Sequence, residues 1–130
     1  GGGSIGLETA EYLMTLWRNV TVVEMLDSVG EDLLDKKMLL KDLEEGGVKI
    51  LTGTKVNRFT KDGAVCTNEN GELVLSGFDT VVLAVGTKAY NPLEEELSES
   101  IGEVYVVGDA VKARKLQDAV KEAALVALRI

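Results

Sequence analysis

The sequence predicts a three-layer α/β domain with a parallel sheet and a small antiparallel meander, in which the first strand of the sheet is missing. Three observations lead to this prediction. Helix-type and strand-type apolar patterns alternate along the N-terminal part in the order α-β-α-β, which is typical of parallel sheets. Short β-like runs separated by polar turns follow. Buried-type runs that end in glycine, and a closing amphipathic segment, complete the chain.

The N-terminal part supplies the alternating order. Apolar residues recur at helical spacing from Ser4 to Trp17, so a helix is expected there. The valine-rich run NVTVVEM is expected to form a short, largely buried strand. A second helix is expected to begin at Asp27 or Ser28, with Glu31 and Asp32 in its first turn. The run VKILTG is the next expected strand.

The middle and C-terminal parts differ in pattern. The runs TKVNRFT, GAVCTN and ELVLSG predict an antiparallel meander, because Asn70-Gly71 is a strong hairpin signal. FDTVVLAVG and EVYVVGDA are expected to be buried strands. The polar segment TKAYNPLEEELSES is expected to be a loop, and KLQDAVKEAALVALRI a closing helix.

The composition restricts the possible functions. The 130 residues carry 22 acidic and 14 basic side chains, a net charge of −8 that disfavours nucleic acid as a partner. The absence of histidine and the presence of one cysteine argue against a transition-metal site. No apolar run is long enough for a membrane span. The lone Cys66 excludes an internal disulfide and favours a reducing compartment, so a cytoplasmic location is expected.

The first residues form a nucleotide-binding pattern. Gly1, Gly3 and Gly6 spell G-x-G-x-x-G, in which the glycines allow a tight turn, close approach of a pyrophosphate and close helix packing. The N-terminus of the following helix, at Ser4 and Ile5, offers free N–H groups to phosphate. A glycine-rich run that only caps a helix is the alternative. The helix and the valine-rich strand that follow without a gap favour a Rossmann-like dinucleotide turn.

Glu24 ends the valine-rich strand and supports the same interpretation. It lies about 20 residues after Gly3, the spacing of the acidic residue that binds an adenosine ribose. A carboxylate there accepts hydrogen bonds from both ribose hydroxyls and repels a 2′-phosphate. The next residues, Met25, Leu26 and Asp27, include no arginine. NAD(H) is therefore expected in preference to NADP(H).

Two later strand ends carry candidate cofactor contacts. Gly86 closes the run TVVLAVG, and Gly108-Asp109 closes VYVVG. A strand that ends in Gly-Asp can direct a carboxylate at a ligand hydroxyl, although the same dipeptide also occurs in simple turns. No residue is expected to act as a nucleophile or proton donor. Cys66 is interpreted as a small buried residue, and Tyr90 is the aromatic residue suspected of touching a cofactor.

The order of GGGSIGLETA, TVVEM, DTVVLAVG and VYVVGDA resembles the pyridine-nucleotide-binding half of flavoprotein reductases with two dinucleotide sites. The tail GDAVKARKLQDAVKEAALVALRI is similar to the C-terminal end of the NADH:flavin oxidoreductases that include 2,4-dienoyl-CoA reductase, 2-enoate reductase and trimethylamine dehydrogenase. In that group proline precedes the arginine and the helix contains His-Glu-Gly. Here Ala113 precedes Arg114, and Lys121-Glu122-Ala123 replaces the triplet.

The resemblance implies that two parts of the chain bind different cofactors. Residues 1–103 would be an NAD(P)-binding domain that lacks its first strand, and residues 104–130 the returning strand and helix of an FAD-binding domain. NAD(H) would pass a hydride to FAD. Gly86 would lie near the mouth of the cofactor cleft, and Gly108 and Asp109 would contact FAD.

The remaining components would lie in other parts of the same polypeptide. The resemblance implies a (β/α)₈ barrel that carries FMN and an iron–sulfur cluster and reduces an enoate- or enoyl-CoA-type substrate. This chain would bind neither FMN nor the cluster. The chain alone is expected to be inactive, with its glycine turn disordered or empty. Unpaired strand edges are expected to favour a homodimer.

Two other functions stay open at this point. The chain could belong to the disulfide-reductase-like class of NADH oxidases and CoA-disulfide reductases. It could also be a structural module that holds ADP or NAD without hydride transfer.

Overall fold

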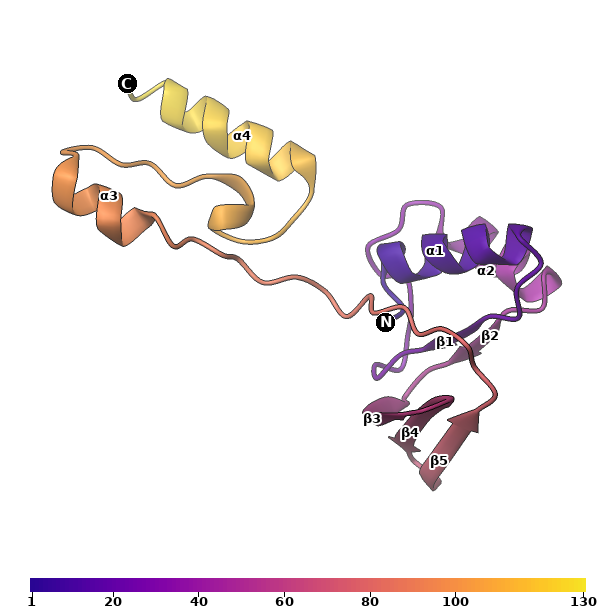
Figure 1. Ribbon diagram of the computed structural model, residues 1–130. Helices are drawn as coiled ribbons and strands as arrows, with labels where there is room; N and C mark the ends of the chain where they lie inside the picture. Colours follow the sequence, from indigo (N-terminus) through magenta and orange to yellow (C-terminus); the bar gives the residue numbers. More distant parts are fainter. The chain divides into compact units, whose positions relative to one another are not determined.

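The computed structural model describes all 130 residues and divides them into two compact units, Gly1–Gly86 and Thr87–Ile130. The first unit contains two helices, a parallel strand pair and a three-stranded meander, and the second contains two helices and a short 3₁₀ turn (Figure 1). The expected boundary between residues 103 and 104 falls inside the second unit. Its functional meaning stays a prediction. None of the helices has the length and apolar character needed to cross a membrane.

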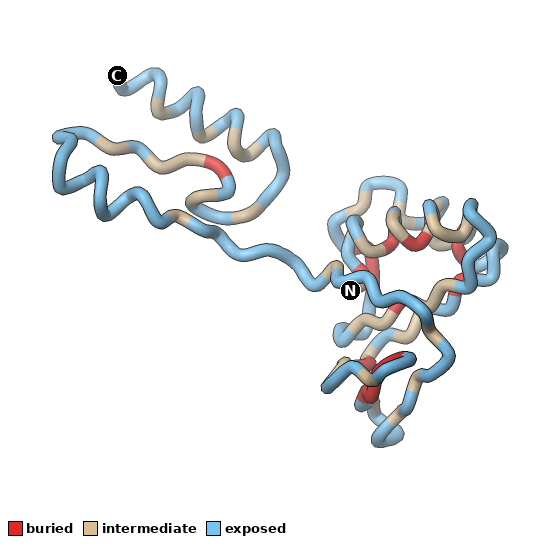
Figure 2. Tube along the Cα trace, viewed as in Figure 1, coloured by how far each residue is buried: buried red, intermediate tan, exposed pale blue.

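The first unit is built on the expected α-β-α-β order. Strand β1 (Thr21–Val23) pairs in parallel with β2 (Lys49–Leu51), which places Val22 opposite Ile50. Helices α1 (Ser4–Thr15) and α2 (Lys36–Glu45) contact each other and lie on one side of this pair (Figure 1). Their shared core consists of the buried residues Leu7, Ala10, Val22, Val29, Leu43 and Val48 (Figure 2).

The meander is confirmed. Strands β3 (Lys55–Thr60), β4 (Gly63–Asn68) and β5 (Gly71–Ser76) pair antiparallel in that order. Gly71 has a φ of +108°, which glycine adopts at little cost in the turn between β4 and β5. The central strand is the most buried of the three, because its residues 63–66 are all buried.

The second helix begins later than expected. A start at Asp27 or Ser28 is wrong, because α2 starts at Lys36 and residues 24–35 form a loop. Gly30 has a φ of +65°, which a right-handed helix cannot contain. The backbone N–H of Gly30 donates to the carbonyl of Gly2 at 2.7 Å. This tertiary contact outweighs the local preference for helix.

The two expected strands FDTVVLAVG and EVYVVGDA do not form. Residues 78–86 and 101–107 belong to no sheet, and Val81, Val82, Leu83 and Val85 stay exposed. Strand β1 pairs only with β2, so residues 80–85 form no ladder with its other edge. A buried strand depends on partner strands, and apolar composition alone does not replace them.

The second unit contains one helix that was not expected. Residues Glu94–Ser100 form α3 where a loop was expected; the three glutamates in its first turn complement the helix dipole. Asn91 Nδ2 donates to Glu94 Oε2 at 2.5 Å just before this helix. The closing helix is confirmed as α4 (Leu116–Ala127) and is preceded by the 3₁₀ turn η1 (Gly108–Ala110). Gly108 is the one buried residue of this unit.

Candidate functional site

The glycine turn is held on its N-terminal side, where no anchor was expected. The N-terminal amine of Gly1 donates to the carbonyl oxygen of Val23 at 3.0 Å. The backbone N–H of Gly2 donates to Glu24 Oε2 at 2.7 Å. Both partners lie at the end of β1. These two hydrogen bonds hold the turn against the strand, and the expectation of a disordered or empty turn stays a prediction.

The close packing around this turn explains its glycines. A Cβ atom at Gly6 would overlap the carbonyl oxygen of Gly1, and one at Gly1 would overlap the carbonyl oxygen of Ala84. A Cβ atom at Gly2 would overlap Val29 Cγ1. The packing thus excludes side chains at Gly1, Gly2 and Gly6. Gly3 differs, since a Cβ there would meet only a carboxylate oxygen of Asp32 at 3.9 Å.

Glu24 faces the glycine turn with both carboxylate oxygens engaged. Oε2 accepts from the N–H of Gly2, and Oε1 accepts from the N–H of Leu26 at 2.8 Å. Desolvation raises the pKa of Glu24, but the backbone N–H donors, with Gly2 first, outweigh it and leave the pKa below its ordinary value. The carboxylate is therefore charged at neutral pH, and each oxygen keeps a lone pair for a further donor.

The N-terminus of α1 has a partner that sequence reasoning missed. The N–H of Ser4 donates to Asp32 Oδ1 at 3.0 Å, and the N-cap residue Gly3 supplies no side-chain cap. Asp32 thus lies at the helix end to which phosphate contacts were predicted. Ile5, the next predicted contact, has an exposed side chain. No sequence signal marked Asp32 for this position, because it stood in the first turn of a predicted helix.

Gly86, Gly108 and Asp109 are the remaining predicted contacts. Gly86, the last residue of the first unit, is exposed with a φ of +90° and follows Ala84 and Val85, whose backbone atoms pack against Gly1. Gly108 and Asp109 belong to the second unit, where they form the start of η1. Within the first unit the structure therefore brings together Gly1, Gly3, Ser4, Gly6 and Glu24. Gly108 and Asp109 are described within the second unit.

In the second unit, Gly108 and Asp109 lie in a hydrogen-bonded turn. The N–H of Gly108, whose φ is +67°, donates to Glu122 Oε2 at 2.7 Å. The guanidinium of Arg114 forms an ion pair with the same carboxylate, and its backbone N–H donates to Asp109 Oδ1 at 3.2 Å. The hydrogen bonds from Arg114 and then Gly108 hold the pKa of Glu122 below its ordinary value. Glu122 and Arg114 thus fix the Gly-Asp turn against α4.

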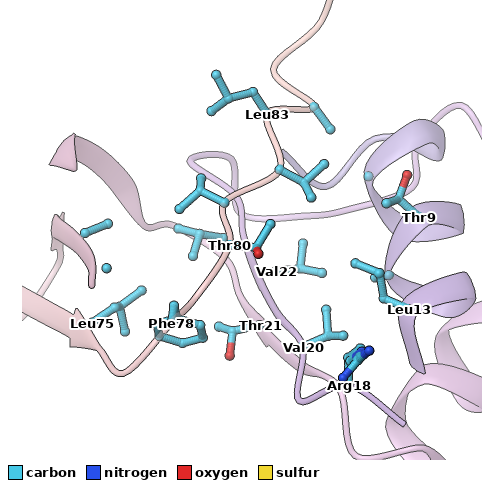
Figure 3. Close-up of a pocket in the computed structure, with 18 of the residues that line it drawn as sticks. Thr9, Leu13, Arg18, Val20, Thr21, Val22, Leu75, Phe78, Thr80 and Leu83 are labelled. Atoms are coloured by element: carbon cyan, nitrogen blue, oxygen red, sulfur yellow. The ribbon is translucent and has the colours of Figure 1, made fainter. Parts of the chain in front are cut away.

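A pocket of about 570 Å³ lies beside the glycine turn. It borders β1 but not β2, and Figure 3 shows it between side chains of α1 (Thr9, Leu13), the β1 region (Val20, Val22) and residues 78–83. Gly1 and Gly6 contribute to its wall, whereas Glu24 does not. The pocket therefore follows the unpaired edge of β1 and separates that edge from the extended residues 80–85.

Residues 1–123 match the family model described as pyridine nucleotide-disulphide oxidoreductase. The chain belongs to this family. The family implies FAD and NAD(H), and its members are oxidoreductases. The predicted fold class is confirmed: a Rossmann-like α/β fragment with a small parallel sheet and a three-stranded meander.

Known proteins support this assignment over the whole chain. A bilirubin reductase from Mediterraneibacter gnavus is 37% identical over 131 residues, which cover 98% of this chain and 20% of the relative. An NADH oxidase from Thermoanaerobacter brockii is 32% identical over 133 residues, which cover 100% of this chain and 20% of the relative. A solved 2-naphthoyl-CoA reductase, in complex with 2-naphthoyl-CoA, superposes with a TM-score of 0.83 at 28% identity. This superposition covers 100% of the present chain and 20% of the reductase chain. The chain thus spans about a fifth of the length of these proteins.

Proposed function

We propose that this chain binds NAD(H) and positions its nicotinamide for hydride transfer to FAD, in a flavin-dependent oxidoreductase that reduces an enoate- or enoyl-CoA-type substrate. The observation that carries the proposal is the joint placement of the glycine turn, the N-terminus of α1 and Glu24 at the end of β1. The finer likeness to the 2,4-dienoyl-CoA reductase group rests on the tail that contains Gly108 and Asp109.

The residues present fit a dinucleotide. Gly1 and Gly6 allow the tight turn and the close packing of α1, and at Gly3 the backbone is open enough for a ligand to approach, since a Cβ there would meet only Asp32 Oδ1 at 3.9 Å. The N-terminus of α1 carries a positive dipole end that favours phosphate. Glu24 is ionised and has lone pairs for ribose hydroxyls. Two of the N–H groups, on Gly2 and Ser4, already have carboxylate acceptors, so the fit involves an exchange of partners.

Glu24 supports a preference for NAD(H) over NADP(H). Its negative charge would lie close to a 2′-phosphate, and Met25 and Leu26 after it are exposed and uncharged. When bound, the nicotinamide supplies the hydride chemistry, and the protein contributes position and charge. Hydride transfer requires no proton transfer by the glycine turn. It requires no thiol either, and Cys66 is buried in β4.

Titration of NADH, NADPH and ADP into the chain tests this proposal, with binding followed by calorimetry. We expect NADH to bind more tightly than NADPH, and Glu24→Ala to weaken NADH binding about tenfold or more, which is about 1.4 kcal/mol. The matched control is Glu8→Ala, an exposed acid on α1. Equal affinity for ADP and NADH in the wild type would instead favour a structural ADP-holding module.

The partners of the chain are part of the proposal. Gly108 and Asp109 would contact FAD together with other parts of the same polypeptide, and FMN and an iron–sulfur cluster would be bound outside residues 1–130. The unpaired edge of β1 supports a homodimer. Light scattering that finds only monomer at high protein concentration would contradict the homodimer.

A further inference from the structure

The contact between Ser4 and Asp32 sits where the proposed function requires phosphate. Ser4 is the first residue of α1, and its N–H donates to Asp32 Oδ1 at 3.0 Å. A carboxylate and a phosphate oxygen compete for the same donors at a helix N-terminus, because both are anionic acceptors. One N–H cannot form a strong hydrogen bond with both at once.

The loop that carries Asp32 is fixed on both sides of it. Val29 is 7% exposed and belongs to the core of the first unit, and Leu33 packs against the same core. Gly30 donates its N–H to the carbonyl of Gly2 at 2.7 Å, and Leu33 donates to the carbonyl of Gly30 at 3.2 Å. The backbone thus brings Asp32 to the glycine turn, and its side chain is exposed at the surface.

We propose that Asp32 is a built-in competitor for the dinucleotide phosphate. Its carboxylate binds the Ser4 N–H when no nucleotide is present and moves away when phosphate arrives. This inference rests on the proposed function only for the identity of the ligand. The Asp32 carboxylate sets the affinity of the turn for phosphate. It also keeps the N-terminus of α1 capped between binding events, since Gly3 supplies no cap of its own.

A purely structural cap makes a different prediction. Removal of a cap lowers helix stability in either case. Only a competitor has a further effect, because loss of the Asp32 charge removes both the occupant of the Ser4 N–H and a repulsion toward incoming phosphate. Phosphate affinity therefore has to rise in the variant even though stability falls.

The test uses inorganic pyrophosphate and NADH as separate probes of the full chain, with the Ser4 amide followed by NMR. Asp32→Ala and Asp32→Asn are compared with Asp35→Asn, which removes an equal charge from the same loop at the N-cap of α2. Asp32→Asn keeps an acceptor oxygen for the Ser4 N–H and so protects the fold. We expect Asp32→Ala, which removes both the occupant of the Ser4 N–H and the charge, to bind pyrophosphate at least tenfold more tightly than the wild type, with Ser4 shifting. Asp32→Asn, which removes the charge alone, should show a smaller gain, and Asp35→Asn should change affinity less than twofold.

The outcomes separate the two proposals. Unchanged or weaker pyrophosphate binding in both folded Asp32 variants overturns the competitor role, and so does an equal gain in Asp35→Asn. Tighter pyrophosphate binding without any NADH binding supports the competitor role and contradicts the proposed NAD(H) function. Tighter binding of both probes, lost for NADH in Glu24→Ala, supports both.

Discussion

The backbone N–H of Gly2 lies 2.7 Å from Glu24 Oε2 and donates a hydrogen bond to it, which ties the glycine turn to the end of β1. The same carboxylate accepts from Leu26 on its other oxygen. Glu24 is therefore both the proposed ribose acceptor and the residue that holds the turn in place. A variant at this position is expected to change stability as well as binding.

The first prediction tests the structural role of Glu24. Glu24→Gln removes the charge that strengthens two backbone hydrogen bonds, so the first unit should lose about 1–2 kcal/mol of unfolding free energy. Urea unfolding followed by circular dichroism measures this loss, and Glu8→Gln on the exposed side of α1 is the control. An unchanged midpoint for Glu24→Gln would mean that the carboxylate does not hold the turn.

The second prediction concerns pH and the second unit. The pKa of Glu122 lies below its ordinary value of 4.5, chiefly because Arg114 donates to it. A lowered folded-state pKa means that the ionised carboxylate stabilises the fold above that ordinary value, and that this contribution is lost as the pH falls through the folded-state pKa. We expect Glu122→Gln to lower the midpoint of thermal unfolding of the second unit near neutral pH, and this effect to shrink as the pH falls below 4.5.

A control for this experiment lies in the same unit. Glu99 is an exposed acid of α3, and Glu99→Gln should leave the pH profile of α4 unchanged. If the midpoint of thermal unfolding of Glu122→Gln followed that of the wild type at every pH from neutral to acid, the result would contradict the ion pair with Arg114.

The third prediction uses the crowding at Gly6. In a helix an alanine is ordinarily more stable than glycine by roughly 0.5–1 kcal/mol. At Gly6 the added methyl would overlap the carbonyl oxygen of Gly1 and press on Ala84, so we expect Gly6→Ala to destabilise the first unit by about 1–3 kcal/mol instead. Gly102→Ala, where no atom lies within 4 Å of the added methyl, is the neutral control. A stabilising Gly6→Ala would exclude the close packing of α1 against the turn.

Local signals predicted most of the regular structure. The hairpin between β4 and β5 depends on Asn70-Gly71, and the structure places Asn68 opposite Gly71 around that turn. Helices α1 and α4 follow from apolar spacing within their own segments. The glycine motif and Glu24 were predicted to belong together, and they lie within hydrogen-bond distance. Each of these features is encoded by residues close in sequence or by a standard motif spacing.

Features that depend on distant partners could not be predicted. Residues 78–86 have the composition of a strand, but β1 offers them no ladder, so they stay extended without pairing. Glu31 and Asp32 look like the acidic first turn of a helix, but the contact of Gly30 with Gly2 keeps them in a loop. The position of Asp32 at Ser4 follows from that contact and has no trace in local sequence.

The last prediction concerns Cys66, the one thiol of the chain. It is fully buried in β4, between β3 and β5, and burial raises the pKa of its thiol. Thiolate is the reactive form, so labelling by a thiol-specific reagent at mildly alkaline pH should be about a hundredfold slower than in the urea-unfolded chain. The labelling rate then reports the opening of the meander. Rapid labelling under native conditions would contradict the burial of β4, whereas Cys66→Ala provides the zero-signal control.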